Sequence, residues 1–249
     1  MRPFRTLAAV LVAAAGLPIQ AQSEAGLLIE AGAEKKLGKK LSLTLDADLR
    51  TRNNLRTWDR WSLGLGAEYK LTKWLKASGG YVLLRTNFSE KVTRNSPTLY
   101  NNWRPSYWGT RHRLHLGLTA SHKFANNIKL SLRERWQYTY RPERTVERWD
   151  FDNAQWENTL RNGAARSQLR SRLQVSYDKK KAKFEPYASI EMYNSWAVEK
   201  IRYTVGTDYH LTKQHTLGLF YRFQKMHNVD PVDNDPDMHY IGIGYNFKF

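Results

Sequence analysis

The sequence predicts an all-β fold, namely an antiparallel transmembrane β-barrel of about 10–12 strands with short periplasmic turns and longer external loops. Three observations predict it. Apolar and polar residues alternate along one segment after another, tight turns alternate with longer polar connections, and aromatic residues gather at both ends of the apolar faces. After the N-terminal region, no segment has the ~20 consecutive apolar residues that a membrane-spanning helix needs.

Strict alternation is clearest in "KLSLTLDADLR", residues 40–50. Leu43 and Leu45 lie on one face of the predicted strand and Asp46 and Asp48 on the other, because successive side chains of a strand point to opposite faces. Eleven such segments follow the N-terminal region, beginning with "AGLLIEAGAEKKL". Bacterial single-chain barrels have even strand numbers. We therefore favour twelve strands, with ten as the alternative if the first segment is not a full wall strand.

Two kinds of connection separate these segments. Tight turns that carry Lys or Asn occur at "LGKK", "LTKW", "FANN", "DKKKAK" and "LTKQ". Longer polar connections lie near residues 52–60, 86–107, 141–166, 194–200 and 227–238. Short turns at one end and long loops at the other are typical of outer-membrane barrels.

The polar face of the segments decides between three architectures. The apolar faces of a β-sandwich meet each other and those of a lipocalin-like barrel surround a ligand, whereas a membrane barrel turns them toward lipid. Charged residues deep inside the strands favour the membrane barrel. The predicted lumen-lining cations are Arg111, Arg113, His115, Arg133, Arg135, Arg170, Arg172, Arg202 and Arg222, and the predicted lumen acids are Asp46, Asp48, Glu68, Glu185, Glu191 and Asp208.

Aromatic residues mark both ends of the predicted lipid-facing surface. Those near the tight turns are Tyr69, Trp74, Tyr177, Phe184 and Tyr209. Those near the long loops are Trp58, Trp61, Trp136, Tyr138, Tyr140, Trp196 and Phe223. Such rings suit the two membrane–water interfaces, where one side of a residue is apolar and the other is wet.

The N-terminus has the pattern of a cleaved signal peptide. Basic residues precede an apolar run, Leu7–Leu17, and Ala21 stands at the expected cleavage site. We therefore expect a signal peptide over residues 1–21 and a barrel over residues 22–249, placed in the outer membrane of a Gram-negative cell. The formal net charge of +17 and the lack of cysteine do not by themselves identify a compartment.

The last segment, "HYIGIGYNFKF", alternates up to the final residue. Its apolar positions are Ile241, Ile243, Tyr245, Phe247 and Phe249. Such a strand has to face lipid and close the sheet, because an open edge would leave backbone groups bare in hydrocarbon. The terminal Phe also resembles the assembly signal of bacterial outer-membrane proteins. The resemblance implies two partners, the barrel-assembly machinery and the lipids of the outer membrane.

Several stretches resemble one family of Gram-negative outer-membrane barrels, the domain-of-unknown-function family numbered two-four-nine-zero. They are "KKLSLTLDADLRTRNN", "RHRLHLGL", "RSRLQVSYD", "FEPYASIEMYN" and "GTDYHLTKQHTLGLFYRFQ". The resemblance covers the chain after the signal peptide. It implies a barrel fold and carries over no activity, cofactor or catalytic residue.

The arginine-rich lumen has two interpretations. The arginines form a cationic track for small anionic solutes, or they pair with the lumen acids and fill a narrow interior. We therefore expect a narrow, porin-like pore or a barrel with a binding or structural role. We expect no nucleic-acid partner, because export separates the protein from DNA and the arginines alternate with leucines along strands.

A membrane-embedded lipid hydrolase or deacylase is the alternative function. It would need a His beside a Ser, and the sequence offers His112 on the lipid face and His115 in the lumen, with Ser131 on the next segment. We expect no enzyme and no cofactor, since no catalytic motif is present. A calcium site at Asp233, Asp235 and Asp237 is a weak candidate, because the turn glycine and closing glutamate of a calcium loop are missing.

Overall fold

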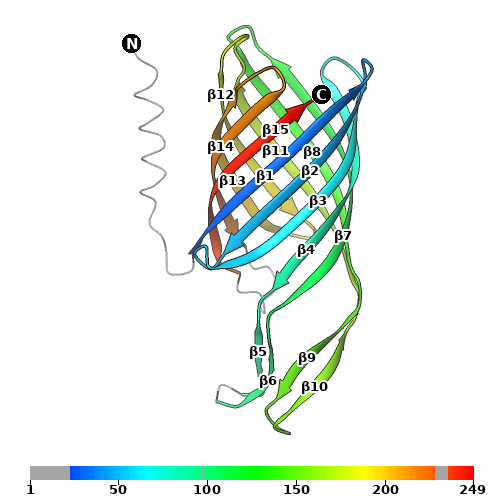
Figure 1. The fold of residues 1–249 in the computed structure, drawn as a ribbon, viewed down its shortest axis with the longest axis vertical. Helices are drawn as coiled ribbons and strands as arrows, with labels where there is room; N and C mark the ends of the chain where they lie inside the picture. Colours follow the sequence, from blue (N-terminus) through cyan, green and yellow to red (C-terminus); the bar gives the residue numbers. More distant parts are fainter. Residues whose placement is uncertain (1–22, 97, 228–234) are drawn as a thin grey trace.

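The computed structural model describes residues 23–96, 98–227 and 235–249 (Figure 1). The expected signal peptide, residues 1–21, lies outside the described residues. The described part holds no helix long and apolar enough to cross a membrane.

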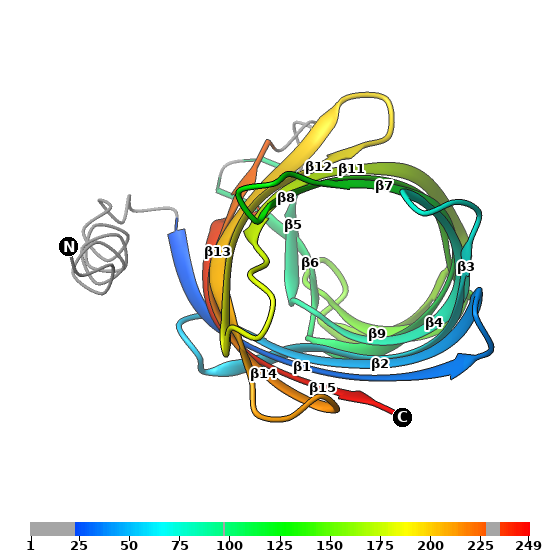
Figure 2. The ribbon, with the colours of Figure 1, turned by 90° about the horizontal axis from the view of Figure 1, so that it is seen from above.

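Eleven strands form one closed barrel (Figures 1 and 2). Their bounds are β1 Ser23–Leu37, β2 Leu41–Arg52, β3 Thr57–Lys70, β4 Leu75–Phe88, β7 Tyr107–Lys123, β8 Ile128–Arg141, β11 Ala164–Tyr177, β12 Phe184–Asn194, β13 Val198–His210, β14 His215–Met226 and β15 Asp237–Lys248. Each strand pairs with its neighbours in chain order, so the wall is a meander. This confirms the predicted barrel.

The barrel closes through a parallel pair, unlike every other pair in its wall. β1 runs beside β15 in the same direction, from Ser23 opposite Asp237 to Glu34 opposite Lys248. An odd number of strands in a meander leaves the first and last strands parallel, and their backbone groups still pair. The favoured number of twelve strands and the alternative of ten are therefore both wrong, because the first segment is a full wall strand in an odd-numbered barrel.

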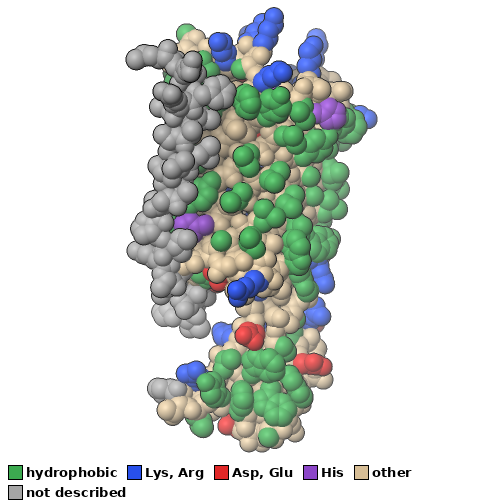
Figure 3. Space-filling model, turned by 60° about the vertical axis from the view of Figure 1, so that its left-hand side comes forward, with side chains coloured by type: hydrophobic (Ala, Val, Ile, Leu, Met, Phe, Trp, Pro, Cys, Tyr) green, Lys and Arg blue, Asp and Glu red, His purple; other side chains and the backbone are tan. Residues whose placement is uncertain are grey.

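All five predicted tight turns lie at one end of the barrel, between strands that end and begin at residues 37 and 41, 70 and 75, 123 and 128, 177 and 184, and 210 and 215. At the opposite end, two of the predicted long connections are short. β3 begins at Thr57 and β13 at Val198, so these strands start before the predicted connections end. The charged residues near both turns had been assigned to the connections, although they belong to the strands. Lys and Arg side chains gather at the tight-turn end (Figure 3).

The outer surface carries the apolar residues that alternation predicted. On β7, Leu114, Leu116 and Leu118 are 54%, 62% and 51% exposed, and on β15 Ile241 and Ile243 are 62% and 50% exposed. Figure 3 shows hydrophobic side chains over the barrel wall. A surface this apolar suits contact with acyl chains, since water-exposed apolar patches of soluble monomers are much smaller.

Inside the barrel, large and small residues alternate across five neighbouring strands. Tyr187, Gly206, Phe220, Gly242 and Leu28 lie opposite one another in that order. A Cβ at Gly206 would lie 2.6 Å from Cβ of Phe220, and one at Gly242 would overlap the Phe220 ring. The glycines therefore let the rings lie against the wall. We call these five residues the inner row.

A second sheet projects from the loop end of the barrel (Figure 1). It consists of two hairpins, in the order β10 (Gln155–Arg161), β9 (Arg144–Asp150), β6 (Tyr100–Arg104) and β5 (Lys91–Arg94). Val92, Trp103, Trp149 and Trp156 lie opposite one another across its four strands. The two longest predicted loops are therefore largely strand, which period-two analysis missed because each strand is only four to seven residues long.

Candidate functional site

The predicted lumen-lining residues occupy inner positions of the barrel. On β7, Arg111, Arg113 and His115 alternate with the exposed Leu114 and Leu116. The same alternation on the other strands turns inward Arg133, Arg135, Arg170, Arg172, Arg202 and Arg222 and the acids Asp46, Asp48, Glu68, Glu185, Glu191 and Asp208.

Glu191 on β12 is the centre of a buried charge cluster. Its Oε1 accepts a hydrogen bond from Arg133 at 2.6 Å, and Arg170 donates to both carboxylate oxygens at 3.0 Å. Arg202 lies 3.9 Å from Oε2, and the Tyr193 hydroxyl donates to Oε2 at 2.9 Å. Because the residue is only 7% exposed, these partners keep an otherwise costly charge in the interior.

Tyr193 extends this cluster across three strands. Its ring is 3% exposed and faces the guanidinium carbons of Arg170 and Arg202 at 4.5 and 4.6 Å. The ammonium of Lys200 lies over the same ring at 4.6 Å. Cation–π contacts of this kind are stronger when water is excluded. Side chains therefore constrict the lumen at this level.

Other inner arginines have no acidic partner. No described carboxylate lies within ion-pair distance of Arg111, Arg113, Arg135 or Arg172. Arg113 donates from Nε to the Thr139 hydroxyl at 3.0 Å, and Nε of Arg135 is buried without a partner. The described lumen therefore has positive charge in excess of its acids.

The prediction that the lumen acids pair with these arginines is correct only in part. Asp46 and Asp208 make no ion pair with any described residue. Several acids lie near the tight-turn end, whereas the arginines lie farther along the strands, and each residue along a strand adds ~3.3 Å. The remaining acids pair as follows: Asp48 with Arg50 at 2.9 Å and Arg60 at 3.3 Å, Glu68 with Lys76 at 3.2 Å, and Glu185 with His210 at 3.4 Å.

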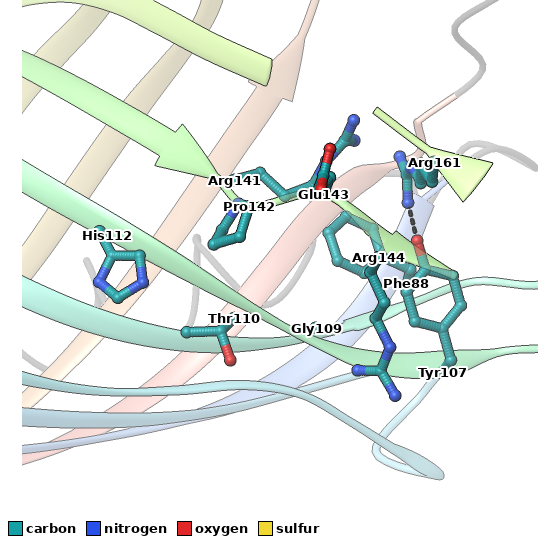
Figure 4. Close-up of a pocket in the computed structure, with 10 residues that line it drawn as sticks. All are labelled: Phe88, Tyr107, Gly109, Thr110, His112, Arg141, Pro142, Glu143, Arg144 and Arg161. Atoms are coloured by element: carbon teal, nitrogen blue, oxygen red, sulfur yellow. Dashed lines mark hydrogen bonds between the residues drawn. The ribbon is translucent and has the colours of Figure 1, made fainter. Parts of the chain in front are cut away.

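A second group of arginines lies at the loop end, where the barrel joins the projecting sheet. They surround the rings of Phe88 and Tyr107, which stack at 5.1 Å. Arg161 and Arg111 each lie 4.6 Å from the Phe88 centroid, and the Arg161 guanidinium also donates to the Tyr107 hydroxyl (Figure 4). We call the whole group the mouth arginines: Arg104, Arg111, Arg141, Arg144 and Arg161.

A cavity of about 350 Å³ opens among these side chains (Figure 4). Its lining combines lumen-facing residues such as Gly109 with outward-facing ones such as His112. Both faces contribute because the pairing of β7 with β8 ends at His112 opposite Tyr140. The Arg144 guanidinium bridges this gap by donating to the Trp108 carbonyl. The cavity is therefore a notch in the wall at the mouth of the lumen.

The register separates the two residues proposed as a hydrolytic pair. His115 lies opposite Gln137, whereas Ser131 lies opposite Ser121, six residues farther along β8. Six residues of strand span ~20 Å, so the suggested pairing of His115 with Ser131 is wrong. His112 faces outward and its Nδ1 lies 2.7 Å from the Tyr81 hydroxyl.

Sequence analysis missed a carboxylate on the lipid-facing surface. Glu134 lies between the exposed Leu132 and Trp136, and its Oε2 accepts a hydrogen bond from Ser171 at 2.6 Å. The alternation predicts this position, because Glu134 directly follows the inward-facing Arg133 and therefore points to the outer face. Glu30, which pairs with Arg222 at 3.2 Å across the closing strands, was also missed, since only the register brings the two together.

The weak calcium candidate and the terminal strand complete the predicted sites. Asp233 lies outside the described residues, and Asp237 accepts hydrogen bonds from Lys225 at 2.7 Å and the Met226 amide at 2.8 Å. The described part holds no cluster of three potential metal-ligating side chains. On the last strand, Tyr245 is 39% exposed and Phe249 is 67% exposed, beside the outward-facing Ile241, Ile243 and Phe247.

A closed meander with an apolar outside and a charged inside defines a transmembrane β-barrel. The chain belongs to the family described as protein of unknown function (DUF2490), whose model matches residues 25–235. No curated protein matches the sequence.

The fold resembles that of a solved outer-membrane barrel domain, and two further solved barrels match less well. The β domain of the Bordetella autotransporter BrkA matches with a TM-score of 0.50 and 13% identity, covering 82% of this chain and 78% of that one. The translocator domain of the autotransporter NalP from Neisseria meningitidis matches with a TM-score of 0.49 and 10% identity, covering 76% of this chain and 70% of that one. The CymD monoaromatic hydrocarbon channel matches with a TM-score of 0.42 and 11% identity, covering 80% of this chain and 82% of that one. At 13% identity the likeness to the BrkA domain concerns the fold alone.

Proposed function

We propose that the protein is a non-enzymatic barrel of the Gram-negative outer membrane whose narrow lumen admits small anionic solutes. The observation that carries this proposal is the excess of inner arginines. Arg113, Arg135 and Arg172 have no ion-pair partner in the described part, so they supply attraction for an anion and repulsion for a cation.

The packing of the lumen limits the size of the solute. The buried cluster of Glu191 and Tyr193 narrows the lumen. On the far side of Glu191 lies a cavity of about 220 Å³, lined by Arg172, Arg222 and other polar residues. This volume suits an ion with a few waters better than a bulky metabolite. The proposal is therefore a restricted anion path and not a wide general porin.

Three features support the outer membrane as the location. The apolar wall, the rings at both strand ends and the apolar alternation of β15 suit insertion between two interfaces. We propose outer-membrane lipids and the barrel-assembly machinery as partners, and a signal peptide cleaved after Ala21 as the export signal. Comparing the N-terminal sequence of the mature protein with residue 22 tests the cleavage site.

Conductance in a planar bilayer tests the proposed function. A tenfold KCl gradient across a bilayer that holds the purified protein is expected to give small openings, with a reversal potential displaced toward that of chloride. Cation selectivity or a silent bilayer would contradict an anion path. Acyl release from phospholipid that is lost in His112→Ala would contradict the non-enzymatic assignment.

A further inference from the structure

We propose that the mouth arginines form a binding site for phosphate groups, separate from the lumen path. The proposal does not depend on whether the lumen conducts. It rests on the cavity of about 350 Å³ at the mouth, which Arg141, Arg144 and Arg161 line together with the rings of Phe88 and Tyr107. Arg113, Arg135 and Arg172, on which the proposed anion path rests, do not line this cavity.

The charge of the site calls for an anion with more than one negative charge. Three arginines line the cavity, Arg104 and Arg111 lie over the rings of Tyr107 and Phe88 beside it, and the one acidic residue in the lining is Glu143. No described carboxylate lies within ion-pair distance of any mouth arginine. Burial lowers the pKa of Arg104, and the neighbouring Arg161 lowers it further. A bound anion would relieve this repulsion between like charges.

The hydrogen-bond donors of the site are mostly unused. The Arg104 guanidinium donates to the Ser89 carbonyl at 3.3 Å, and that of Arg141 to the Asn162 carbonyl at 2.9 Å. Nε of each is buried without a partner in the described part. An arginine has five N–H donors, so most donors of the group have no protein acceptor.

A phosphate monoester matches this site better than a carboxylate. It carries ~1.5 to 2 negative charges at neutral pH and three acceptor oxygens, whereas a carboxylate has one charge and two oxygens. The rings of Phe88 and Tyr107 hold Arg161 in place, because its guanidinium packs against both. A preorganised guanidinium loses less entropy when it binds its ligand.

The phosphate can come from two sources. Since the notch is lined by residues of both faces of the wall, it is open to lipid head groups beside the barrel and to solutes that approach the lumen. A phosphorylated glycolipid of the outer leaflet and a phosphorylated solute present the same chemistry to the arginines. The experiment must therefore offer both.

Binding is measured with the full chain folded in octyl glucoside, a detergent without phosphate. Calorimetry with inorganic phosphate and glucose 6-phosphate reports the soluble source, with glucose and acetate as matched ligands. Native mass spectrometry with lipid A, either bisphosphorylated or dephosphorylated, reports the lipid source. We expect saturable binding of at least one phosphorylated ligand and none of its unphosphorylated counterpart.

Two substitutions test the residues. Arg144→Gln, at an exposed position, and Arg161→Gln are each expected to weaken binding about tenfold or more, since each removes a charge-assisted hydrogen bond. Arg148→Gln is the matched control, because Arg148 is in the same sheet and already pairs with Glu157 at 2.9 Å. Heat-modifiable gel migration verifies folding of each variant.

Three outcomes would overturn the site. They are the absence of saturable binding of every phosphorylated ligand to the wild-type protein, equal weakening in Arg148→Gln and Arg144→Gln, and binding of acetate as tight as that of the phosphorylated ligands. Binding of glucose 6-phosphate alone would assign the soluble source. Binding of bisphosphorylated lipid A alone would assign the head group. Either result supports recognition of phosphate.

Discussion

The buried cluster around Glu191 and the mouth arginines have the same side-chain type in opposite electrostatic situations. In the cluster, Arg133 and Arg170 share one carboxylate at 2.6 and 3.0 Å. At the mouth, guanidinium groups pack against Phe88 and Tyr107 with no carboxylate in ion-pair distance among the described residues. The cluster therefore has an internal counter-charge for its arginines, whereas the mouth arginines have none among the described residues.

This difference shows why the number of arginines in a barrel is a poor guide to its function. An arginine that pairs with an internal carboxylate contributes to the packing of the lumen, and the carboxylate offsets part of its attraction for a solute. An arginine held by a ring keeps its full charge. The partners of each guanidinium therefore matter more than its presence on the inner face.

Removing the central carboxylate should have the largest effect. Glu191→Gln leaves Arg133, Arg170 and Arg202 facing one another without a counter-charge, and we expect a loss of ~3–5 kcal/mol in the free energy of unfolding. Urea unfolding in detergent micelles measures it. Glu157→Gln, which breaks the half-buried pair with Arg148, serves as control and should cost under ~1 kcal/mol. Equal losses of stability in the two variants would mean that the buried cluster stabilises the barrel no more than the pair of Arg148 with Glu157.

An intermediate effect is expected from the inner row, which tests whether the lumen is packed as well as charged. A methyl group at Gly242 would overlap the Phe220 ring, so Gly242→Ala should destabilise the barrel by ~1–3 kcal/mol. At Gly244, two residues away on the same face, the nearest atom would be 3.8 Å from the new Cβ. Gly244→Ala should therefore be neutral or stabilising by ~0.5 kcal/mol. Unfolding midpoints that do not differ would indicate a loosely packed lumen.

The smallest effect is expected for an unpaired lumen arginine. Arg113→Gln removes a charge without breaking an ion pair, so stability should change little while the anion-to-cation permeability ratio falls about fivefold. Reversal potentials measure this ratio. Arg148→Gln, in the projecting sheet and paired with Glu157, is the control and should leave selectivity unchanged. A similar change in both variants would mean that Arg113 does not face the path.

Alternation predicted the two faces of the wall but not the partners across it. The inward position of Glu191 follows from period two, because its neighbours Ile190 and Met192 are apolar. Its contact with Arg133 depends on the register of three strands, and no local pattern states that register. The parallel closure was missed because an even number of strands was assumed from other bacterial barrels, although eleven segments were counted in this chain.

The site at the mouth could not be predicted from the sequence, because the residues that form it are distant along the chain. Phe88 ends one barrel strand, Tyr107 begins the next and Arg161 ends a strand of the projecting sheet. The two hairpins that bring them together were predicted only as polar loops. Their strands are too short for a period to be recognised, and the hairpins are joined by contacts between residues distant in the sequence, such as the pairing of β6 with β9 and the hydrogen bond from the Phe151 amide to the Asn101 carbonyl.

The odd number of spans has a practical consequence for mapping the molecule. Because eleven antiparallel strands follow one another from β1 to β15, Ser23 and Lys248 lie at opposite ends of the barrel. A label at the first residue of β1 is on the same side as the projecting sheet, and a label at the C-terminus is on the same side as the tight turns. Accessibility of the two labels to a reagent that does not cross the bilayer would thus orient the whole barrel in one experiment.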